Sequence, residues 1–332
     1  MNQSINRRQV IQTAGALAAS TALPGLLTSA HAQAAWPTKP IRLLVPFAPG
    51  GSSEIVARSA AGELSKSLGQ NVFVENKPGA SGNIAMQECA ASTDGHTIIL
   101  GHIGTMAVNP YIYDKLPFDT EKDFKPISLL AKVPSLYVVN ADVPVKNLKE
   151  FIALARAKPG QLNYGSAGNG SAGHLAFEYL KMATGIFVLH VPYRGTGPQL
   201  TDLLAGRLEA ASVGAPAILG HIKAGKLRCI ATGTKDRLPQ LPDVPTVAES
   251  GFPGFEMTQW YGLNAPANMP QAHIDRIADG CAKAMRNAQA TERLRGDTAL
   301  PVGDTPAQYA AFIKTEQTRW KEVVARAKIK PD

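Results

Sequence analysis

Short apolar runs alternate with segments of helical periodicity along most of the chain. Residues 41–47 form an almost continuous apolar run, as expected for a strand buried on both faces, and residues 53–69 repeat apolar positions at helical spacing. The same patterns predict a strand at 71–77, a helix at 83–91 and a strand at 96–102. This βαβαβ order favours a parallel sheet that is covered by helices.

A second series of the same kind occupies the middle of the chain. It alternates strands predicted at 136–140, 161–166, 187–193, 208–214 and 226–233 with helices predicted at 148–158, 173–184 and 198–206. Residues 238–256 are then rich in Pro and Gly, which indicates a surface connection or a hinge. A further strand is predicted at 257–266, and the last helix at 306–328. This order predicts two α/β lobes, with the carboxyl end of the chain completing the first.

The N-terminus has the pattern of an export signal. Two arginines precede a mildly apolar stretch that ends in the cleavage pattern Ala-His-Ala at residues 30–32. The segment SINRRQVIQ resembles a twin-arginine signal, although Gln12 stands where a basic residue is usual, and an ordinary Sec signal is the alternative. No other segment approaches the roughly 18 apolar residues that span a bilayer. We therefore expect residues 1–32 to be a signal peptide and the mature chain to be periplasmic.

The charge of the chain is moderately positive. Its formal net charge is +8 over 332 residues, and removing residues 1–32, with two arginines and no acid, leaves +8 − 2 = +6. This excess suits an anionic ligand. Lys and Arg are too dispersed for a nucleic-acid-binding surface. The three cysteines, Cys89, Cys229 and Cys281, are too widely spaced for a disulfide framework or a metal site. The sequence does not distinguish between one disulfide and three buried thiols.

Two loops carry the most informative chemistry. VPFAPGGSSEIVAR (45–58) and NYGSAGNGSAGHLAFEYL (163–180) each place glycines and serines between a predicted strand and a predicted helix. Ligands of open α/β sheets bind at this position, where the first backbone N–H groups of a helix have no partner and the helix dipole favours negative charge. One such loop alone would be an ordinary connection. Two of them favour a site that holds an anion without a formal cation.

The sequence lacks the motifs of several enzyme classes. GNGSAG at 168–173 matches G-x-G-x-x-G, but no acidic residue follows at the distance that a dinucleotide fold requires. There is no phosphate-binding loop, no G-x-S-x-G and no H-E-x-x-H. We therefore expect no catalytic residue, no cofactor and no metal. The alternative is an exported hydrolase that uses Ser171 with His174, for which no acidic partner is identifiable.

Several single side chains allow two interpretations each. His174 is a hydrogen-bond donor to a ligand or to the facing loop, or else a structural histidine. Glu54 complements the dipole of the helix that it begins, or contacts the ligand. Arg194 closes on a second carboxylate, or is a solvated surface residue. For Trp260 and Tyr261, packing is favoured over lining a ligand cleft.

The chain resembles the periplasmic receptors of tripartite tricarboxylate transporters, also called Bug-type solute-binding proteins. The resemblance covers about Trp36 to Asp332. It rests on the ordered blocks WPTKPIRLLVPFAPGGSSEIVAR, ENKPGASGNIA, NPYIYDKLPFDTEKDFKPI, NYGSAGNGSAGHLAFE, HVPYRGTGPQLTDLLAGRLE, LPDVPTVAESGFPGFEMTQWYGLNAP and RWKEVVARAKIK. It implies the two-lobed periplasmic binding protein fold, an α/β fold in which each lobe is a mostly parallel sheet flanked by helices, with two crossovers between the lobes. The lobes would be residues 33–128 plus 233–332, and residues 129–232.

The resemblance also implies how a ligand is held. The two loops pinch one carboxylate of the ligand, with backbone amides and ordered waters contributing. The matching positions are Gly50, Gly51, Ser52 and Ser53 in one loop, Ser166, Ala167, Gly168 and Ser171 in the other, and Thr105 bordering the cleft. Beside these matches, we expect Phe47, Glu54, His174 and Arg194 to be ligand-binding residues. The family often has Asp where this chain has Glu54, so the ligand does not transfer from the family average.

The predicted function is that of a monomeric solute-binding protein that closes on a carboxylate and is recognised by membrane subunits of a tripartite tricarboxylate transporter. Within the family, the chain looks closest to receptors for terephthalate, an aromatic dicarboxylate. A sensory receptor without a transport role is an alternative of the same kind, and the exported hydrolase is the alternative from another class.

Overall fold

The structure is a computed structural model that describes residues 36–327, 329 and 330. The predicted signal peptide, residues 1–32, lies outside the described residues. The described residues from Pro37 onward form one compact unit. This unit is described below, and no described helix in it is long and apolar enough to cross a membrane.

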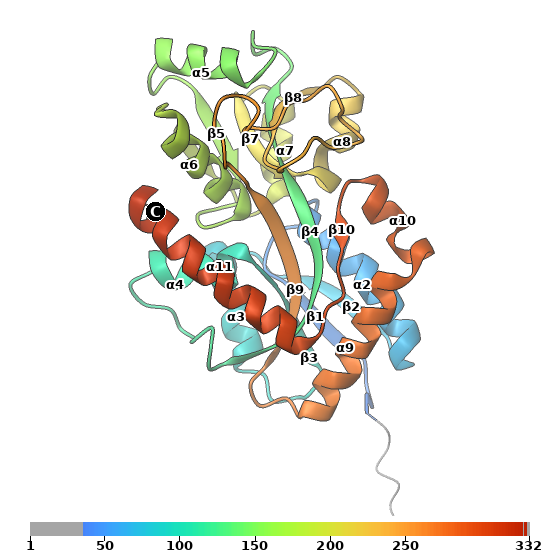
Figure 1. The fold of residues 1–332 in the computed structure, drawn as a ribbon. Helices are drawn as coiled ribbons and strands as arrows, with labels where there is room; N and C mark the ends of the chain where they lie inside the picture. The colour runs from blue at the N-terminus through green and yellow to red at the C-terminus, as the bar shows by residue number, and fades with distance from the viewer. Residues whose placement is uncertain (1–35, 328, 331–332) are drawn as a thin grey trace, which may run out of the picture. The chain divides into compact units, whose positions relative to one another are not determined.

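Within the described residues, ten strands form one continuous sheet in the order β2-β1-β3-β9-β4-β7-β5-β6, with β8 and β10 also pairing with β4. The first half, sheet A, contains β1 (Ile41–Val45), β2 (Val72–Asn76), β3 (Thr97–His102), β9 (Thr258–Pro266) and β10 (Leu300–Pro301). The second half, sheet B, contains β5 (Asn163–Ser166), β6 (Leu189–Pro192), β7 (Ala210–Gly214) and β8 (Leu227–Thr232). The long strand β4 (Phe124–Asn140) belongs to both halves, as Figure 1 shows.

The predicted α/β class is confirmed, but the sheet is mixed. The pairs β1–β2, β1–β3, β5–β6 and β5–β7 are parallel, as the βαβ patterns indicated. The five pairs that involve β4 or β9 are antiparallel. These two strands run through the middle of the sheet, and the helices that follow them do not lead to a strand that pairs with them in parallel.

Strand β4 is much longer than the sequence predicts. Only 136–140 was expected to be a strand, because Lys125, Pro126, Lys132 and Pro134 interrupt the apolar pattern before it. The structure pairs Phe124 to Pro134 with β9, with register shifts after Pro126 and after Leu129. Pairing with β9 therefore overrides the local sequence signal, and the irregular register accommodates prolines that cannot donate to the ladder.

Helices pack around both halves of the sheet. Sheet A is accompanied by α2 (Ser52–Leu68), α3 (Asn83–Ala90), α4 (Asn109–Ile112), α9 (Gln271–Arg286), α10 (Ala288–Gly296) and α11 (Pro306–Ala327), and by the short turns Ala80–Gly82 and Gly104–Val108. Sheet B is accompanied by α5 (Leu148–Ala157), α6 (Ala172–Thr184), α7 (Thr196–Leu204) and α8 (Ala215–Lys223). Cys89, Cys229 and Cys281 are buried free thiols.

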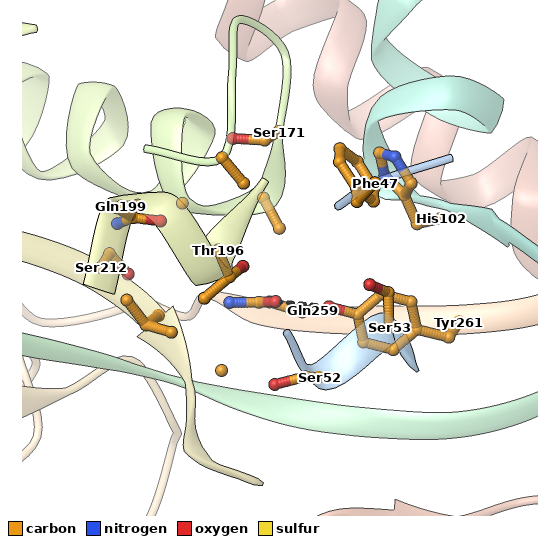
Figure 2. A pocket seen from close by; sticks show the side chains of 15 residues that line it. Phe47, Ser52, Ser53, His102, Ser171, Thr196, Gln199, Ser212, Gln259 and Tyr261 are labelled. Atoms are coloured by element: carbon orange, nitrogen blue, oxygen red, sulfur yellow. Dashed lines mark hydrogen bonds between the residues drawn. The ribbon is translucent and has the colours of Figure 1, made fainter. Parts of the chain in front are cut away.

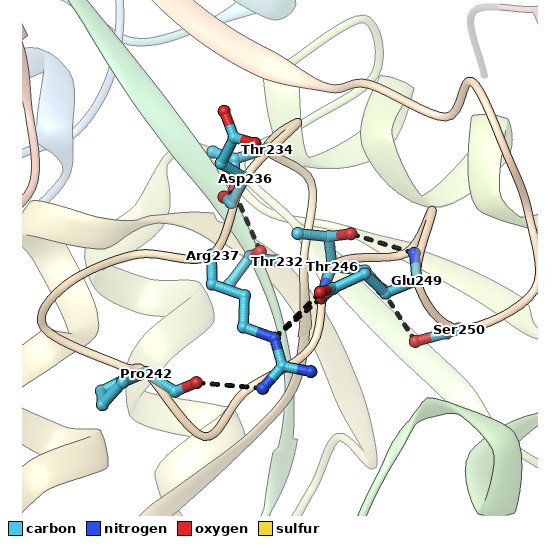
Figure 3. Close-up of polar contacts among 8 residues, drawn as sticks. All are labelled: Thr232, Thr234, Asp236, Arg237, Pro242, Thr246, Glu249 and Ser250. Carbon is cyan, nitrogen blue, oxygen red and sulfur yellow. Dashed lines mark hydrogen bonds and ion pairs between the residues drawn. The ribbon is translucent and has the colours of Figure 1, made fainter.

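The segment between β8 and β9 returns the chain from sheet B to sheet A. Gly233 N–H donates to Ser135 O at 2.8 Å, which ties its start to β4. Farther along, Arg237 Nε donates to both carboxylate oxygens of Glu249, at 2.9 and 3.1 Å, and its Nη1 donates to Pro242 O, as Figure 3 shows. These contacts lie on the surface and hold a Pro- and Gly-rich connection in one conformation, in agreement with the prediction of a surface connection.

Candidate functional site

A cavity of about 30 Å³ lies where loops of sheet A meet loops of sheet B. Its lining comes from the β1–α2 loop, the β5–α6 loop, the first residues of α7, the end of β7, and one face of β9 (Figure 2). This volume has room for about two water molecules. A dicarboxylate is larger, so some of the lining side chains must move outward to hold one.

Four helix N-termini converge on this cavity. Ser52 and Ser53 begin α2, Ala172 and Gly173 begin α6, Thr196 begins α7, and Gly214 is the N-cap of α8. The first N–H groups of a helix have no partner inside it, and each N-terminus carries about half a positive charge. No side chain caps α2, α7 or α8. The cavity therefore offers several backbone donors in a field that favours an anion.

The described residues that line the cavity include no Lys, Arg, Asp or Glu. An anion bound here would be stabilised by helix dipoles and neutral hydrogen-bond donors alone. Serine hydroxyls, the amide of Gln259 and the ring of His102 supply these donors, while Phe47 and Tyr261 add aromatic surface. The Gln199 amide also lines the cavity, but its Nε2 donates to Gly165 O at 2.9 Å. This combination suits a carboxylate attached to an apolar or aromatic body.

Three buried polar atoms around the cavity lack a hydrogen-bond partner within the described residues. They are Ser52 Oγ from α2, Ser212 Oγ from β7, and His102 Nε2 from β3. The three side chains are between 1% and 3% exposed. Buried polar groups are rarely left unpaired in folded proteins, and functional sites are a common reason when they are. Their concentration at one cavity points to a ligand with hydrogen-bonding oxygens.

The tautomer of His102 follows from its surroundings. Gly104 N–H donates to His102 Nδ1 at 2.7 Å, so Nδ1 is the acceptor and Nε2 carries the proton. Burial lowers the pKa of His102 to about 3 because the charged form would lose its hydration. The ring is therefore neutral at physiological pH. It lies 4.6 Å, centroid to centroid, from the ring of Phe47, and both rings line the cavity.

Five of the residues predicted from the sequence line the cavity. They are Phe47, Ser52, Ser53, Ala167 and Ser171, and they come from both predicted loops. The structure thus brings the two Gly-Ser loops to one place. Direct contact of these residues with a ligand stays a prediction.

Glu54 and Gly50 contact each other rather than the cavity. Gly50 N–H donates to Glu54 Oε2 at 2.8 Å, and Arg58 Nη2 lies 2.7 Å from Glu54 Oε1. The Glu54 carboxylate therefore stabilises the loop before α2 and complements the positive end of the α2 dipole. This is the structural role, one of the two interpretations of Glu54 that the sequence allowed. Gly51 is the N-cap of α2, adjacent to the lining residue Ser52.

Three predicted residues are buried beside the cavity without lining it. Thr105 Oγ1 accepts from His102 N–H at 3.2 Å, and Ser166 Oγ lies 2.6 Å from His190 Nε2. The ring of His174 accepts at Nδ1 from Gly170 N–H at 3.0 Å. Each of these side chains shapes a loop or ring that borders the cavity, and a direct ligand contact for any of them stays a prediction.

Gly168 and Arg194 also lie outside the lining. Gly168 has a φ of +120°, which favours glycine, and its N–H donates to Ser166 Oγ at 3.1 Å. The Arg194 side chain is exposed, while its carbonyl oxygen accepts from Ala48 N–H at 3.1 Å. A guanidinium contact to the ligand would need a different side-chain position from the one in the structure.

The pair proposed for hydrolysis is not arranged as a nucleophile and its base. Ser171 Oγ accepts from the backbone N–H of His174 at 3.4 Å, as an N-cap does. The His174 ring is directed to Gly170 and stacks on His190 at 4.2 Å. Within the described residues, no group of three His, Cys, Asp or Glu side chains could hold a metal ion.

Sequence reasoning missed several lining residues. Thr196 and Ser212 lie near the starts of α7 and α8, so the rule that found the two Gly-Ser loops would also have indicated these two positions. Gln259 carries no such signal, because it is a single polar residue in an apolar strand. Tyr261, assigned to packing, lines the cavity, whereas Trp260 belongs to the main hydrophobic core.

The β1–α2 loop and the β6–α7 loop contact each other next to the lining residues Ser52 and Thr196. We call Gly50, Gly51, Gly195 and Gly197 the glycine seam. A Cβ on Gly197 would lie 2.3 Å from Pro49 O, and a Cβ on Gly195 would lie 2.7 Å from Ala48 N. Only glycine permits this approach of one backbone to the other. Because β1 belongs to sheet A and β6 to sheet B, the seam joins the two halves of the sheet.

Comparison with known proteins identifies the family. Residues 56–329 match the family described as "Tripartite tricarboxylate transporter family receptor". Protein BugT of Bordetella pertussis is 36% identical over 291 residues, which is 87% of this chain and 89% of BugT.

Two solved structures are similar along their whole length. An R. palustris protein solved with adipate has a TM-score of 0.86 at 36% identity and covers 90% of this chain and 100% of its own. MatC of Rhodopseudomonas palustris, solved with malate, has a TM-score of 0.83 at 33% identity and covers 87% of this chain and 100% of its own. Members of the family are solute-binding receptors rather than enzymes. The chain belongs to the receptor family of the tripartite tricarboxylate transporters.

Proposed function

We propose that this chain is an exported receptor that captures a dicarboxylate between its two halves and presents it to a tripartite tricarboxylate transporter. The convergence of four helix N-termini on a cavity without charged side chains carries this proposal. One carboxylate of the ligand lies among these N-termini and accepts hydrogen bonds from their backbone N–H groups. Ser52 and Ser212, whose hydroxyls lack partners, complete its coordination.

The ligand that we favour is an aromatic dicarboxylate such as terephthalate. The rings of Phe47, His102 and Tyr261 line the cavity and offer flat apolar surface to a benzene ring. The similar structures solved with adipate and malate make aliphatic dicarboxylates the main alternative. The planar body of terephthalate would contact the aromatic rings, which a flexible chain or a small hydroxy acid would contact less well.

Closure is the second part of the proposed mechanism. We propose that residues 33–128 plus 233–332 form one lobe, that residues 129–232 form the other, and that residues 1–32 direct export. The passage of β4 and of the β8–β9 connection between the sheet halves supports this division. A ligand that contacts both halves stabilises the closed arrangement in which the glycine seam is formed, and the transporter recognises that arrangement.

Titration calorimetry on the mature chain, refolded to remove bound ligand, tests the proposal. The panel contains terephthalate, isophthalate, benzoate, adipate, malate and citrate. We expect saturable binding of terephthalate, weaker binding of the aliphatic diacids, and recovery of intact ligand after long incubation. Binding of adipate or malate alone would retain the receptor and reject the aromatic ligand. Turnover of a ligand would favour the hydrolase alternative, and no binding of any carboxylate would reject the receptor proposal.

Measuring ligand uptake distinguishes a transport receptor from a sensory receptor. A strain that lacks this chain and carries the transporter subunits should lose uptake of the bound dicarboxylate and regain it with the wild-type chain. Normal uptake combined with a lost transcriptional response to the ligand would favour the sensory alternative.

A further inference from the structure

Strand β9 places two polar side chains on the face that lines the cavity. Gln259 and Tyr261 are two residues apart and therefore point to the same side of the strand. Both are almost fully buried, at 4% and 5% exposure. Between them, Trp260 points to the opposite face, where it packs against Tyr309 and Phe312 of α11. A glutamine in this position is costly unless its amide is hydrogen bonded.

The orientation of the Gln259 amide is set by Tyr261. The Tyr261 hydroxyl donates to Gln259 Oε1 at 2.8 Å. In Figure 2 the amide nitrogen points away from Tyr261, toward Thr196 at the start of α7. Burial raises the pKa of Tyr261, so its hydroxyl stays protonated and remains the donor in this pair. The amide thus presents its two N–H donors to the space between the sheet halves.

These donors come from neither Gly-Ser loop. The loops and helix N-termini already account for one carboxylate, whereas β9 belongs to the sheet beneath them. An amide NH₂ group is a donor only, so it favours a ligand oxygen that accepts hydrogen bonds and gains nothing from a C–H group. Its neutral charge also avoids the cost of burying a cation at the floor of the cavity.

We propose that Gln259, held in position by Tyr261, selects the ligand by donating hydrogen bonds to a second carboxylate beyond the one held by the helix N-termini. This inference rests on the proposed receptor function. Gln259 contacts the ligand and determines specificity, and Tyr261 is a positioning residue that acts through Gln259. The preference for dicarboxylates over monocarboxylates therefore depends on this pair.

Paired ligands and variants test the proposal. Affinities are measured for terephthalate against benzoate and for adipate against hexanoate, in the wild-type chain, Gln259→Met, Tyr261→Phe and the double variant. Gln259→Met keeps the length of the side chain and removes its donors. We expect it to weaken dicarboxylate binding about tenfold or more and monocarboxylate binding less than threefold, since a hydrogen bond to a charged group is lost only with the former. Gln161→Leu, an exposed glutamine on the same sheet half as the β5–α6 loop, is the matched control and should bind as wild type.

The role of Tyr261 has its own readout. Tyr261→Phe keeps the ring but removes the hydrogen bond to the Gln259 amide. We therefore expect a smaller loss of affinity than in Gln259→Met, confined to dicarboxylates. In the Gln259→Met background it should have no further effect on the ratio of the two affinities, because its action passes through the amide.

The outcomes separate this inference from the receptor proposal. Equal losses for monocarboxylates and dicarboxylates in Gln259→Met, or wild-type affinities for both, would overturn the selective role while the receptor function stands. A wild-type chain that binds no carboxylate would overturn both. Unfolding curves without ligand check that each variant folds. If Gln259→Met does not fold, the dicarboxylate-specific loss in Tyr261→Phe decides the question, and equal losses there reject the proposal.

Discussion

The hydroxyls of Ser52 and Ser212 are buried at the cavity without partners, so removing them should affect binding and stability in opposite ways. An unpaired buried hydroxyl destabilises the ligand-free protein, and its loss costs nothing there. We expect Ser52→Ala and Ser212→Ala to leave the melting temperature unchanged or raise it slightly, and to weaken ligand binding by about 1–2 kcal/mol. Calorimetry and thermal unfolding measure the two effects.

Ser59→Ala is the matched control for this pair. Ser59 lies on the same helix as Ser52, but its hydroxyl donates to Ile55 O at 2.9 Å, away from the cavity. Its removal should leave affinity unchanged. If Ser52→Ala and Ser212→Ala bind as tightly as wild type, their hydroxyls do not contact the ligand.

Two buried histidines should make stability depend on pH. Burial lowers the pKa of His102 to about 3 and that of His174 to about 4, below the unfolded value of about 6.5. As the pH falls, protons therefore bind these histidines in the unfolded chain before they bind them in the folded protein. The contribution of the neutral histidines to the free energy of unfolding is fully present above pH 6.5 and is lost as the pH falls toward 4. Each histidine should cost about 2 kcal/mol between pH 7 and pH 5.

Urea unfolding at a series of pH values measures this loss. His174→Gln should reduce the slope of unfolding free energy against pH by about one proton between pH 6 and pH 5. An unchanged slope would show that His174 is not held in its neutral form.

How much of the site could be predicted depends on the residue. Ser52, Ser53 and Ser171 were found because the chemistry of a loop before a helix is local in sequence. The orientation of Gln259 depends on Tyr261 and on the register of β9 against β3 and β4, which no short window contains. Glu54 was recognised as the start of a helix, yet only the structure shows that it accepts a hydrogen bond from Gly50.

At the scale of elements, local periodicity identified most helices and strands to within a few residues. Helix α2 was predicted at 53–69 and spans Ser52–Leu68, because its apolar positions and its terminal Gly69 are local signals. Strand β4 was largely missed, because it is held by pairing with β9 and interrupted by prolines. The antiparallel pairing at the centre of the sheet was missed for the same reason, since the periodicity of a segment does not specify which distant segment it pairs with.

The start of α7 offers a test of the glycine seam. Gly197→Ala should raise the helix propensity of α7 by up to about 1 kcal/mol, while its Cβ would lie 2.3 Å from Pro49 O and keep the two loops apart. We therefore expect unchanged or slightly higher stability without ligand and at least about tenfold weaker ligand binding. Unfolding curves and calorimetry measure the two effects.

Gly62→Ala is the control for this substitution. Gly62 lies inside α2, and a Cβ there would meet nothing within 4 Å. It should gain a similar helix stabilisation of roughly 0.5–1 kcal/mol and bind ligand as wild type. Wild-type affinity in Gly197→Ala would mean that binding does not require the seam to form.

At the scale of the whole unit, the proposed closure can be followed by a cross-link across the seam. Ala48 N–H donates to Arg194 O at 3.1 Å, so the backbones of these residues lie side by side in the closed arrangement. The variant Ala48→Cys with Arg194→Cys should form a disulfide that ligand accelerates several-fold, because the ligand shifts the population toward closure. Loss of free thiols over time measures the rate.

The three native cysteines should not react in this thiol measurement. Cys89, Cys229 and Cys281 are buried, and burial raises the pKa of the Cys229 and Cys281 thiols to about 12, so almost none of the reactive thiolate is present at neutral pH. Each single variant should therefore show one reactive thiol and no ligand effect. In the double variant, the oxidised form should release bound ligand more slowly than the reduced form, since the seam can no longer open. A cross-linking rate that ligand leaves unchanged or slows would contradict closure of the two halves on the ligand.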